Sequence, residues 1–114
     1  MNREALIALR DAVKAERLTV AMCEDAWPER HEHSDDDPAY HALEAYHGSL
    51  DAALALHEAV LPGWAAVCDT TGLATVWFAG VEGDAPYHDG ESVNNPARAW
   101  LLAILEALIA ETPE

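Results

Sequence analysis

Basic residues are scarce in this chain of 114 residues. Lysine and arginine total 6 against 21 aspartates and glutamates, which sets the formal net charge at −15. Proteins that bind nucleic acids or anionic membranes neutralise phosphate with Lys and Arg, so direct binding to either is disfavoured. The excess of carboxylates either suits a basic protein partner or serves only to keep a small protein in solution.

Cysteine is also scarce, and long apolar runs are missing. The spacing of Cys23 and Cys68 matches neither a zinc motif nor a disulfide framework, which favours free thiols in a reducing compartment, with a single bridge left open. No basic and apolar leader opens the chain, and the most apolar stretch, 99–110, is too short to span a membrane and contains Glu106. We therefore expect a cytoplasmic protein that does not bind membranes.

Catalytic signatures are missing as well. The sequence contains no nucleophile elbow, phosphate-binding loop or paired-cysteine motif. His88 and Asp89 are the one adjacent acid–base pair of interest, but neighbours in an extended segment point to opposite sides. We expect a protein without enzymatic activity and without a cofactor.

Potential metal ligands gather in the first half of the chain: Cys23, His31, Glu32, His33, His41 and His47. Their spacing fits neither a zinc finger nor a two-histidine helix motif. The acidic run 35–37 lacks the alternating acids and central glycine of a calcium loop. No metal site is expected, and the histidines are interpreted as solvent-exposed.

The first third of the chain divides into a helix and an acidic segment. Residues 1–17 carry a net charge of +1 and place Leu6, Leu9 and Val13 at helical spacing, which predicts an amphipathic helix. Residues 18–37 carry −6, lose that period and are interpreted as a connecting segment. The predicted partner-binding residues lie here: Glu24, Asp25, Trp27, Glu29, Glu32, Asp35, Asp36 and Asp37. Trp27 suits an interface anchor, and equally well a cover over one end of the core.

Residues 38–111 are predicted to form a helix-helix-hairpin-helix core. Asp37 as N-cap and Gly48 as stop bound the first helix, and Ser49 caps the second. We expect Leu50, Ala53, Leu54 and Val60 of the second helix to share its buried side.

The stretch "LPGW" at 61–64 ends that second helix sharply, because Pro62 cannot continue the hydrogen-bond ladder. Apolar runs at 64–69 and 73–80 follow, separated by a glycine-containing loop, and predict an antiparallel hairpin. Residues 85–88 are expected to add a shorter third strand.

Asn95 and Pro96 mark the start of a closing helix that runs to residue 111. Its residues are apolar on nearly every side, so it is expected to be either central or covered by a second copy in a homodimer. Together these elements predict one α+β domain over 1–114, in which a hairpin or three-stranded meander packs with three to four helices.

Two of these segments carry a family resemblance. The stretches "SLDAALALHEAVLPGW" and "NNPARAWLLAILEALIA", with the strand pair between them, resemble the phage α/β/α sandwich domain family of small phage and prophage proteins. The resemblance covers about residues 46–111. It implies an accessory protein with no catalytic set to transfer, and it leaves the acidic stretch 23–37 as an addition.

Two functions of different kinds follow from these features. In the first, a phage-encoded protein inhibits a host nucleic-acid-handling or defence complex, such as a CRISPR effector, by presenting carboxylates to its basic groove. In the second, the chain is an assembly module that associates through residues 99–110, and its acids serve only solubility.

Overall fold

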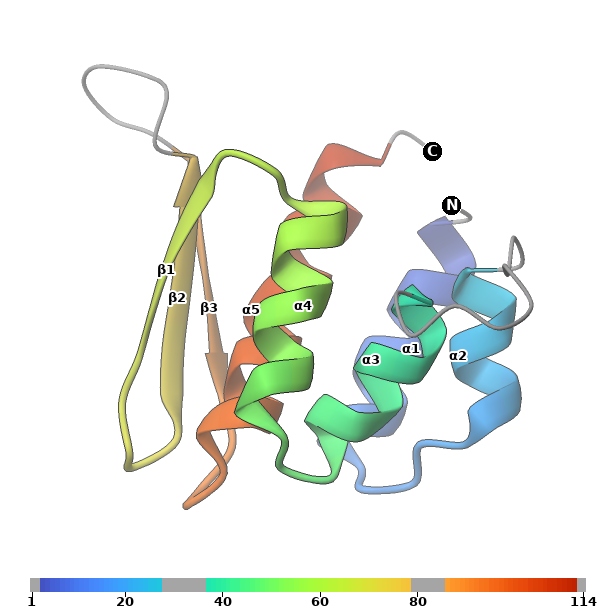
Figure 1. Cartoon of the computed structure of the whole chain (residues 1–114). Helices are drawn as coiled ribbons and strands as arrows, with labels where there is room; N and C mark the ends of the chain where they lie inside the picture. The colour runs from blue at the N-terminus through green and yellow to red at the C-terminus, as the bar shows by residue number, and fades with distance from the viewer. Residues whose placement is uncertain (1–2, 28–36, 79–85, 113–114) are drawn as a thin grey trace.

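Four helices open the chain, a small sheet follows, and one helix closes it (Figure 1). The computed structural model describes residues 3–27, 37–78 and 86–112. The elements are α1 (Arg3–Lys14), α2 (Val20–Ala26), α3 (Pro38–Tyr46), α4 (Leu50–Val60), β1 (Trp64–Cys68), β2 (Leu73–Phe78), β3 (Tyr87–Glu91) and α5 (Pro96–Glu111). The α+β class is confirmed, with five helices in the described ranges where three to four were predicted.

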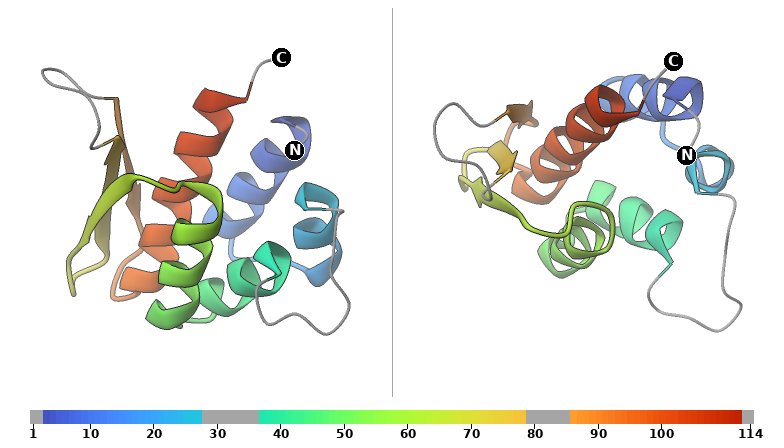
Figure 2. Two further views of the ribbon diagram at one scale, coloured as in Figure 1. Left: turned by 45° about the horizontal axis from the view of Figure 1, so that its top comes forward. Right: turned by 90° about the horizontal axis from the view of Figure 1, so that it is seen from above.

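The three strands form an antiparallel meander in the order β1-β2-β3. The described helices all lie on one side of this sheet, with α5 against the strands, α4 beside α5, and α1, α2 and α3 farther away (Figure 2). The predicted hairpin is confirmed, with Ala66 opposite Val76. The third strand lies at 87–91 and not at 85–88, and it pairs with β2 along its whole length.

Helix α5 is central. Its buried residues are Ala97, Ala99, Leu101, Leu102, Ala103, Ile104, Leu105, Ala107, Leu108 and Ile109. The sheet covers one side of the helix, and α1, α3 and α4 cover the others. The apolar surface of α5 is therefore buried within one chain, and a second copy is not needed to cover it.

The sheet approaches α5 closely at Gly90. A Cβ atom built on this residue would lie 2.1 Å from the carbonyl oxygen of Ala99 and 2.4 Å from the amide nitrogen of Ala103. Both are backbone atoms, which a side-chain rotation cannot move. Glycine at this position sets the distance between β3 and the central helix.

The interpretation of 18–37 as a connecting segment was wrong for its first half, which contains α2. Thr19 caps this helix, because its hydroxyl accepts a hydrogen bond from the amide of Met22 at 3.3 Å. Cys23 and Ala26 point into the core. A helix of seven residues spans only about two turns, too few for a repeated apolar pattern to stand out in the sequence, and the packing of Cys23 and Ala26 stabilises it.

The predicted caps of the later helices are confirmed at Asp37, Ser49 and Asn95. The predicted inner side of α4 was partly wrong. Leu50 and Leu54 are each 45% exposed, while other residues of α4 take the buried side. These are Ala52, Ala53, Leu56 and His57.

Candidate functional site

The structure describes four of the eight predicted partner-binding residues. Glu24 and Asp25 lie on α2, Trp27 ends that helix, and Asp37 precedes α3. Glu29, Glu32, Asp35 and Asp36 lie outside the described residues, as do His31 and His33.

Helices α2 and α3 bring two of these carboxylates to one small hollow. Glu24 and Asp37 line it together with Val20 and Tyr40, each of which is 53% exposed. The hollow measures about 130 Å³. That volume is far below the several hundred Å³ of a typical cofactor site, so it suits the end of one side chain of a partner.

The same two carboxylates act on the buried thiol of Cys23. Burial, and to a smaller extent the negative charges of Glu24 and Asp37, raise the pKa of this thiol to about 11. Because the thiolate is the reactive form, Cys23 is an inert core residue. Both cysteines are free, as predicted, and Cys68 is exposed.

The prediction that Trp27 anchors an interface was wrong. Its side chain is only 6% exposed and belongs to the hydrophobic core. The indole nitrogen is buried, and no group in the described ranges accepts its hydrogen bond. Trp27 therefore covers one end of the core, which was the other expectation for it.

Three basic residues of α1 bind α5. Arg10 Nη1 donates to Glu106 Oε1 at 3.2 Å, and Lys14 Nζ lies 3.9 Å from the same oxygen. Arg3 donates through Nε to the carbonyl of Ile109 at 3.2 Å. These cations are occupied at the contact between the two helices.

Arg98 is occupied in the same way at the start of α5. Its Nε donates to the carbonyl of Tyr46 at 2.9 Å and its Nη1 to Glu16 at 3.0 Å. The guanidinium carbon also lies 4.2 Å from the centroid of the Tyr46 ring. Four of the five Lys and Arg residues in the described ranges thus have partners within the chain.

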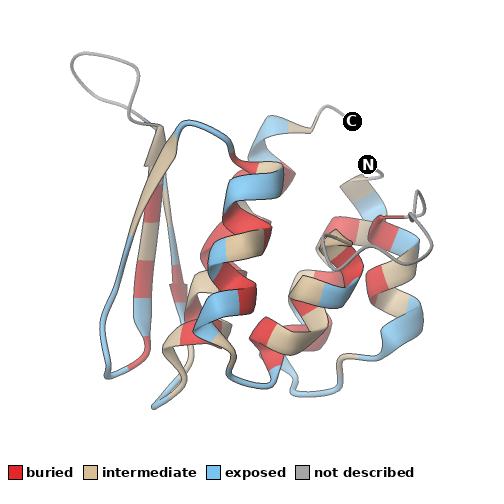
Figure 3. Ribbon diagram, in the orientation of Figure 1, coloured by how far each residue is buried: buried red, intermediate tan, exposed pale blue. Residues whose placement is uncertain are grey.

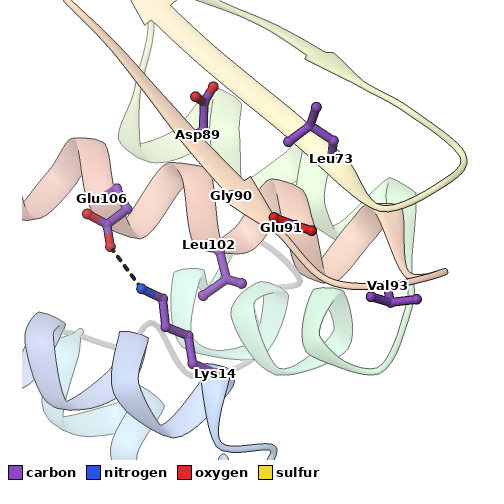
Figure 4. A pocket seen from close by; sticks show the side chains of 8 residues that line it. All are labelled: Lys14, Leu73, Asp89, Gly90, Glu91, Val93, Leu102 and Glu106. Carbon is purple, nitrogen blue, oxygen red and sulfur yellow. Dashed lines mark ion pairs between the residues drawn. The ribbon is translucent and has the colours of Figure 1, made fainter.

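A larger hollow lies beside β3, between the edge of the sheet and helices α1 and α5 (Figure 4). It measures about 570 Å³ and is lined by the carboxylates of Asp89, Glu91 and Glu106, with Lys14 as the one cation. Leu73, Val93 and Leu102 supply an apolar part of its wall. Sequence reasoning missed this hollow, because its residues come from four elements and one loop that are far apart in the chain.

The acid–base pair of His88 and Asp89 does not form. Successive residues of β3 point to opposite faces, and His88 lies opposite the buried Val76. Asp89 points to the other face, where it accepts a hydrogen bond from the hydroxyl of Thr75 at 2.6 Å.

Within residues 3–27, 37–78 and 86–112, no three His, Cys, Asp or Glu side chains meet in an arrangement that could hold a metal ion. None of the helices in those ranges combines the length and the apolar character that crossing a membrane requires.

Comparisons with protein families, with curated proteins and with solved structures found no match. The resemblance to the phage α/β/α sandwich family stays a prediction.

Proposed function

We propose that this chain is a non-enzymatic protein that binds the basic groove of a host nucleic-acid-handling or defence complex and inhibits it by occupying that groove. The observation that supports the proposal is that basic and acidic residues differ in how far they are paired within the chain. Four of the five Lys and Arg residues in the described ranges are occupied in contacts within the chain, whereas many carboxylates are exposed. The exposed ones in the described ranges are Glu4, Asp11, Glu16, Asp25, Asp51, Glu58, Asp69, Asp89, Glu91 and Glu111.

A surface of this kind supports competition with a polyanion. With a net charge of −15 on one small domain, long-range attraction steers the chain toward a basic groove. A groove filled in this way is closed to nucleic acid, whose own affinity comes largely from phosphate contacts with Lys and Arg. The resemblance to phage proteins supports a host protein as the target.

The alternative of self-association through residues 99–110 loses its basis in this structure. That alternative depended on an uncovered apolar helix, and the apolar residues of α5 are buried against the sheet and the other helices.

The test is affinity capture on the immobilised chain from nuclease-treated host lysate, at about 0.1 M and about 1 M salt, between which electrostatic screening changes strongly. We expect a nucleic-acid-binding protein at low salt that is lost at high salt. The purified partner should then release labelled nucleic acid when this chain is added. Retention at high salt, or simultaneous binding of nucleic acid, would contradict the proposal.

Two matched variants distinguish the effect of negative charge on partner binding from the effect of side-chain shape. Asp25→Asn, Asp51→Asn, Asp89→Asn and Glu91→Gln together remove four exposed charges, and we expect them to weaken capture by at least about tenfold. The control makes the reciprocal exchanges Asp→Glu and Glu→Asp at the same positions and should bind nearly as well as the parent. Equal loss in both variants would show that charge does not carry the binding.

A further inference from the structure

The sheet has one face that the helices do not cover. Ala74, Val76 and Gly90 point toward α5 and are buried, so the residues between them point the opposite way. No helix or strand of the described ranges lies over that face, as Figure 1 shows, and Figure 3 shows its exposed positions. We call it the open sheet face. It consists of Ala65, Val67, Leu73, Thr75, Trp77, Tyr87, Asp89 and Glu91.

This face carries large apolar side chains in solvent. Tyr87 is 65% exposed, Val67 58% and Leu73 48%. Trp77 lies directly between Ala65 and Tyr87 across the strands, so the two aromatic side chains are neighbours. The solvent side of an antiparallel sheet is ordinarily polar. Exposed Val67, Leu73 and Tyr87, next to the half-buried Trp77, are therefore typical of a protein interface.

The same face is acidic and carries no cation. Residues 64–78 and 86–95 contain three carboxylates and no Lys or Arg. Asp89 and Glu91 follow Tyr87 at alternate positions of β3 and are exposed, and the hydroxyl of Thr75 holds Asp89 in place. The third, Asp69, lies in the turn before β2, where the backbone amide and then the hydroxyl of Thr71 donate to it and lower its pKa.

The hollow beside β3 continues this acidic surface. Leu73, Asp89 and Glu91 belong both to the open sheet face and to the wall of the hollow. Glu106 lies deeper and is paired with Lys14 (Figure 4). A side chain that crosses the face from the aromatic pair can therefore place its charged end among the carboxylates at the hollow.

We propose that the open sheet face, together with this hollow, is the surface that binds a basic, arginine-bearing segment of the partner protein. The inference rests on the proposed function, which requires a basic partner, and it adds the place of contact and the chemistry of the segment. Charge complementarity and the aromatic pair, formed by the exposed Tyr87 and the half-buried Trp77, identify the occupant. The hollow between α2 and α3 is the competing location on the same chain.

Arginine suits this surface better than lysine. Its planar guanidinium stacks on the rings of Trp and Tyr and also forms paired hydrogen bonds to a carboxylate, whereas an ammonium group is a compact, strongly hydrated charge. Apolar residues next to the arginines would cover Val67 and Leu73. The open sheet face thus favours a segment in which arginine and aliphatic residues alternate.

The test uses the full chain, labelled with ¹⁵N, and a synthetic peptide of alternating arginine and leucine. We expect the peptide to shift the amide signals of β2 and β3 and the indole signal of Trp77 at low salt. Tyr87→Ser and the pair Asp89→Asn, Glu91→Gln should each weaken binding by at least about tenfold. These residues are exposed, and the spectrum of each variant shows directly whether the fold is kept.

Two control variants remove one and two charges from the helical side, the second as many as the sheet pair. Asp25→Asn alone, and Asp51→Asn with Glu58→Gln, should change the affinity by less than about threefold, as expected of distant screened charges. An alternating lysine and leucine peptide should bind more weakly than the arginine peptide.

The outcomes distinguish the inference from the proposed function. If the shifts fall on α2 and α3, and Asp25→Asn weakens binding as much as the sheet variants do, the open sheet face is not the site, while a basic partner is still supported. If the arginine peptide does not bind, or a glutamate and leucine peptide binds equally well, both proposals fail.

Discussion

Trp100 donates its indole N–H to Nδ1 of His57, at a distance of 3.2 Å between the nitrogens. Because an indole nitrogen can only donate, Nδ1 must be the unprotonated nitrogen of the imidazole. The proton therefore lies on Nε2, which donates to the carbonyl oxygen of Trp64 at 2.8 Å. A histidine that is only 5% exposed thus joins α4, α5 and the first residue of β1.

Replacing His57 tests this junction. His57→Ala leaves the indole N–H of Trp100 and the carbonyl of Trp64 without their partner and opens a cavity, so we expect it to lower the free energy of unfolding by about 2–4 kcal/mol. His57→Gln keeps one donor and one acceptor and should cost clearly less. Urea denaturation followed by circular dichroism measures both. The exposed His47→Ala is the control, and a loss at His57 no larger than at His47 would contradict the assigned role.

Alanine substitutions at Gly90 and Gly48 should lower stability for two different reasons, a steric clash at Gly90 and a strained backbone conformation at Gly48. Gly90→Ala places a methyl group against backbone atoms of α5, so β3 must move, and we expect a loss of about 3 kcal/mol or a failure to fold. Gly48 has φ +108° with its nearest atom 4.0 Å away, so Gly48→Ala meets only the conformational cost, about 1–2 kcal/mol. The measurement is thermal and urea unfolding of both variants. Equal losses would show that β3 tolerates a side chain at position 90.

The raised pKa of the Cys23 thiol predicts that the folded chain loses stability at alkaline pH. The pKa of its thiol is about 11 in the folded chain against 9.0 for an unburied thiol, so above pH 9 the unfolded chain loses this proton first. The contribution is fully present below pH 9 and is lost as the pH rises toward 11, with a size of about 3 kcal/mol.

Unfolding of the parent and of Cys23→Ala should be compared between pH 8 and pH 11. The parent should lose stability over this range more steeply than the variant, although the variant starts lower because of its cavity. Cys68→Ala, at an exposed thiol, should follow the parent. Identical slopes in the parent and Cys23→Ala would contradict a buried neutral thiol.

Local chemistry explains which parts of the fold could be predicted. The caps at Asp37, Ser49 and Asn95 were predictable because a side-chain oxygen satisfies an amide two or three residues away. The sharp stop at 61–64 was predictable because Pro62 cannot continue the hydrogen-bond ladder of a helix. It turns the chain from α4 directly into β1, and Gly63 adopts the left-handed φ of +86° there.

Tertiary packing decided the parts that were not predictable. The buried side of α4 is set by where α3 and α5 lie, which selects Leu56 and His57 over Leu50 and Leu54. The hollow beside β3 joins residues as distant as Lys14 and Glu106, which no spacing in the sequence reveals. Of the described residues of the predicted acidic site, Glu24 and Asp37 meet at one hollow, because α2 carries Glu24 and packs against α3, which Asp37 caps.

The three contacts of Arg98 should contribute different amounts to the free energy of unfolding, which substitutions can test. Its ion pair with Glu16 contributes little, because Glu16 is 75% exposed and a solvated pair is worth a few tenths of a kcal/mol. The hydrogen bond to the Tyr46 carbonyl and the stacking on the Tyr46 ring lie on the buried side, since the Arg98 side chain is 18% exposed. Arg98→Lys keeps the charge and loses the planar group, so we expect a loss of about 1–2 kcal/mol in urea unfolding.

Two variants separate these contributions. Glu16→Gln should cost less than about 0.5 kcal/mol, since it removes only the exposed ion pair. Arg17→Lys, at an exposed cation, should be neutral within the same limit. If Glu16→Gln costs as much as Arg98→Lys, the ion pair and not the contact with Tyr46 accounts for the stability that Arg98 contributes. If Arg98→Lys is neutral, the stacked guanidinium contributes nothing that an ammonium group cannot replace.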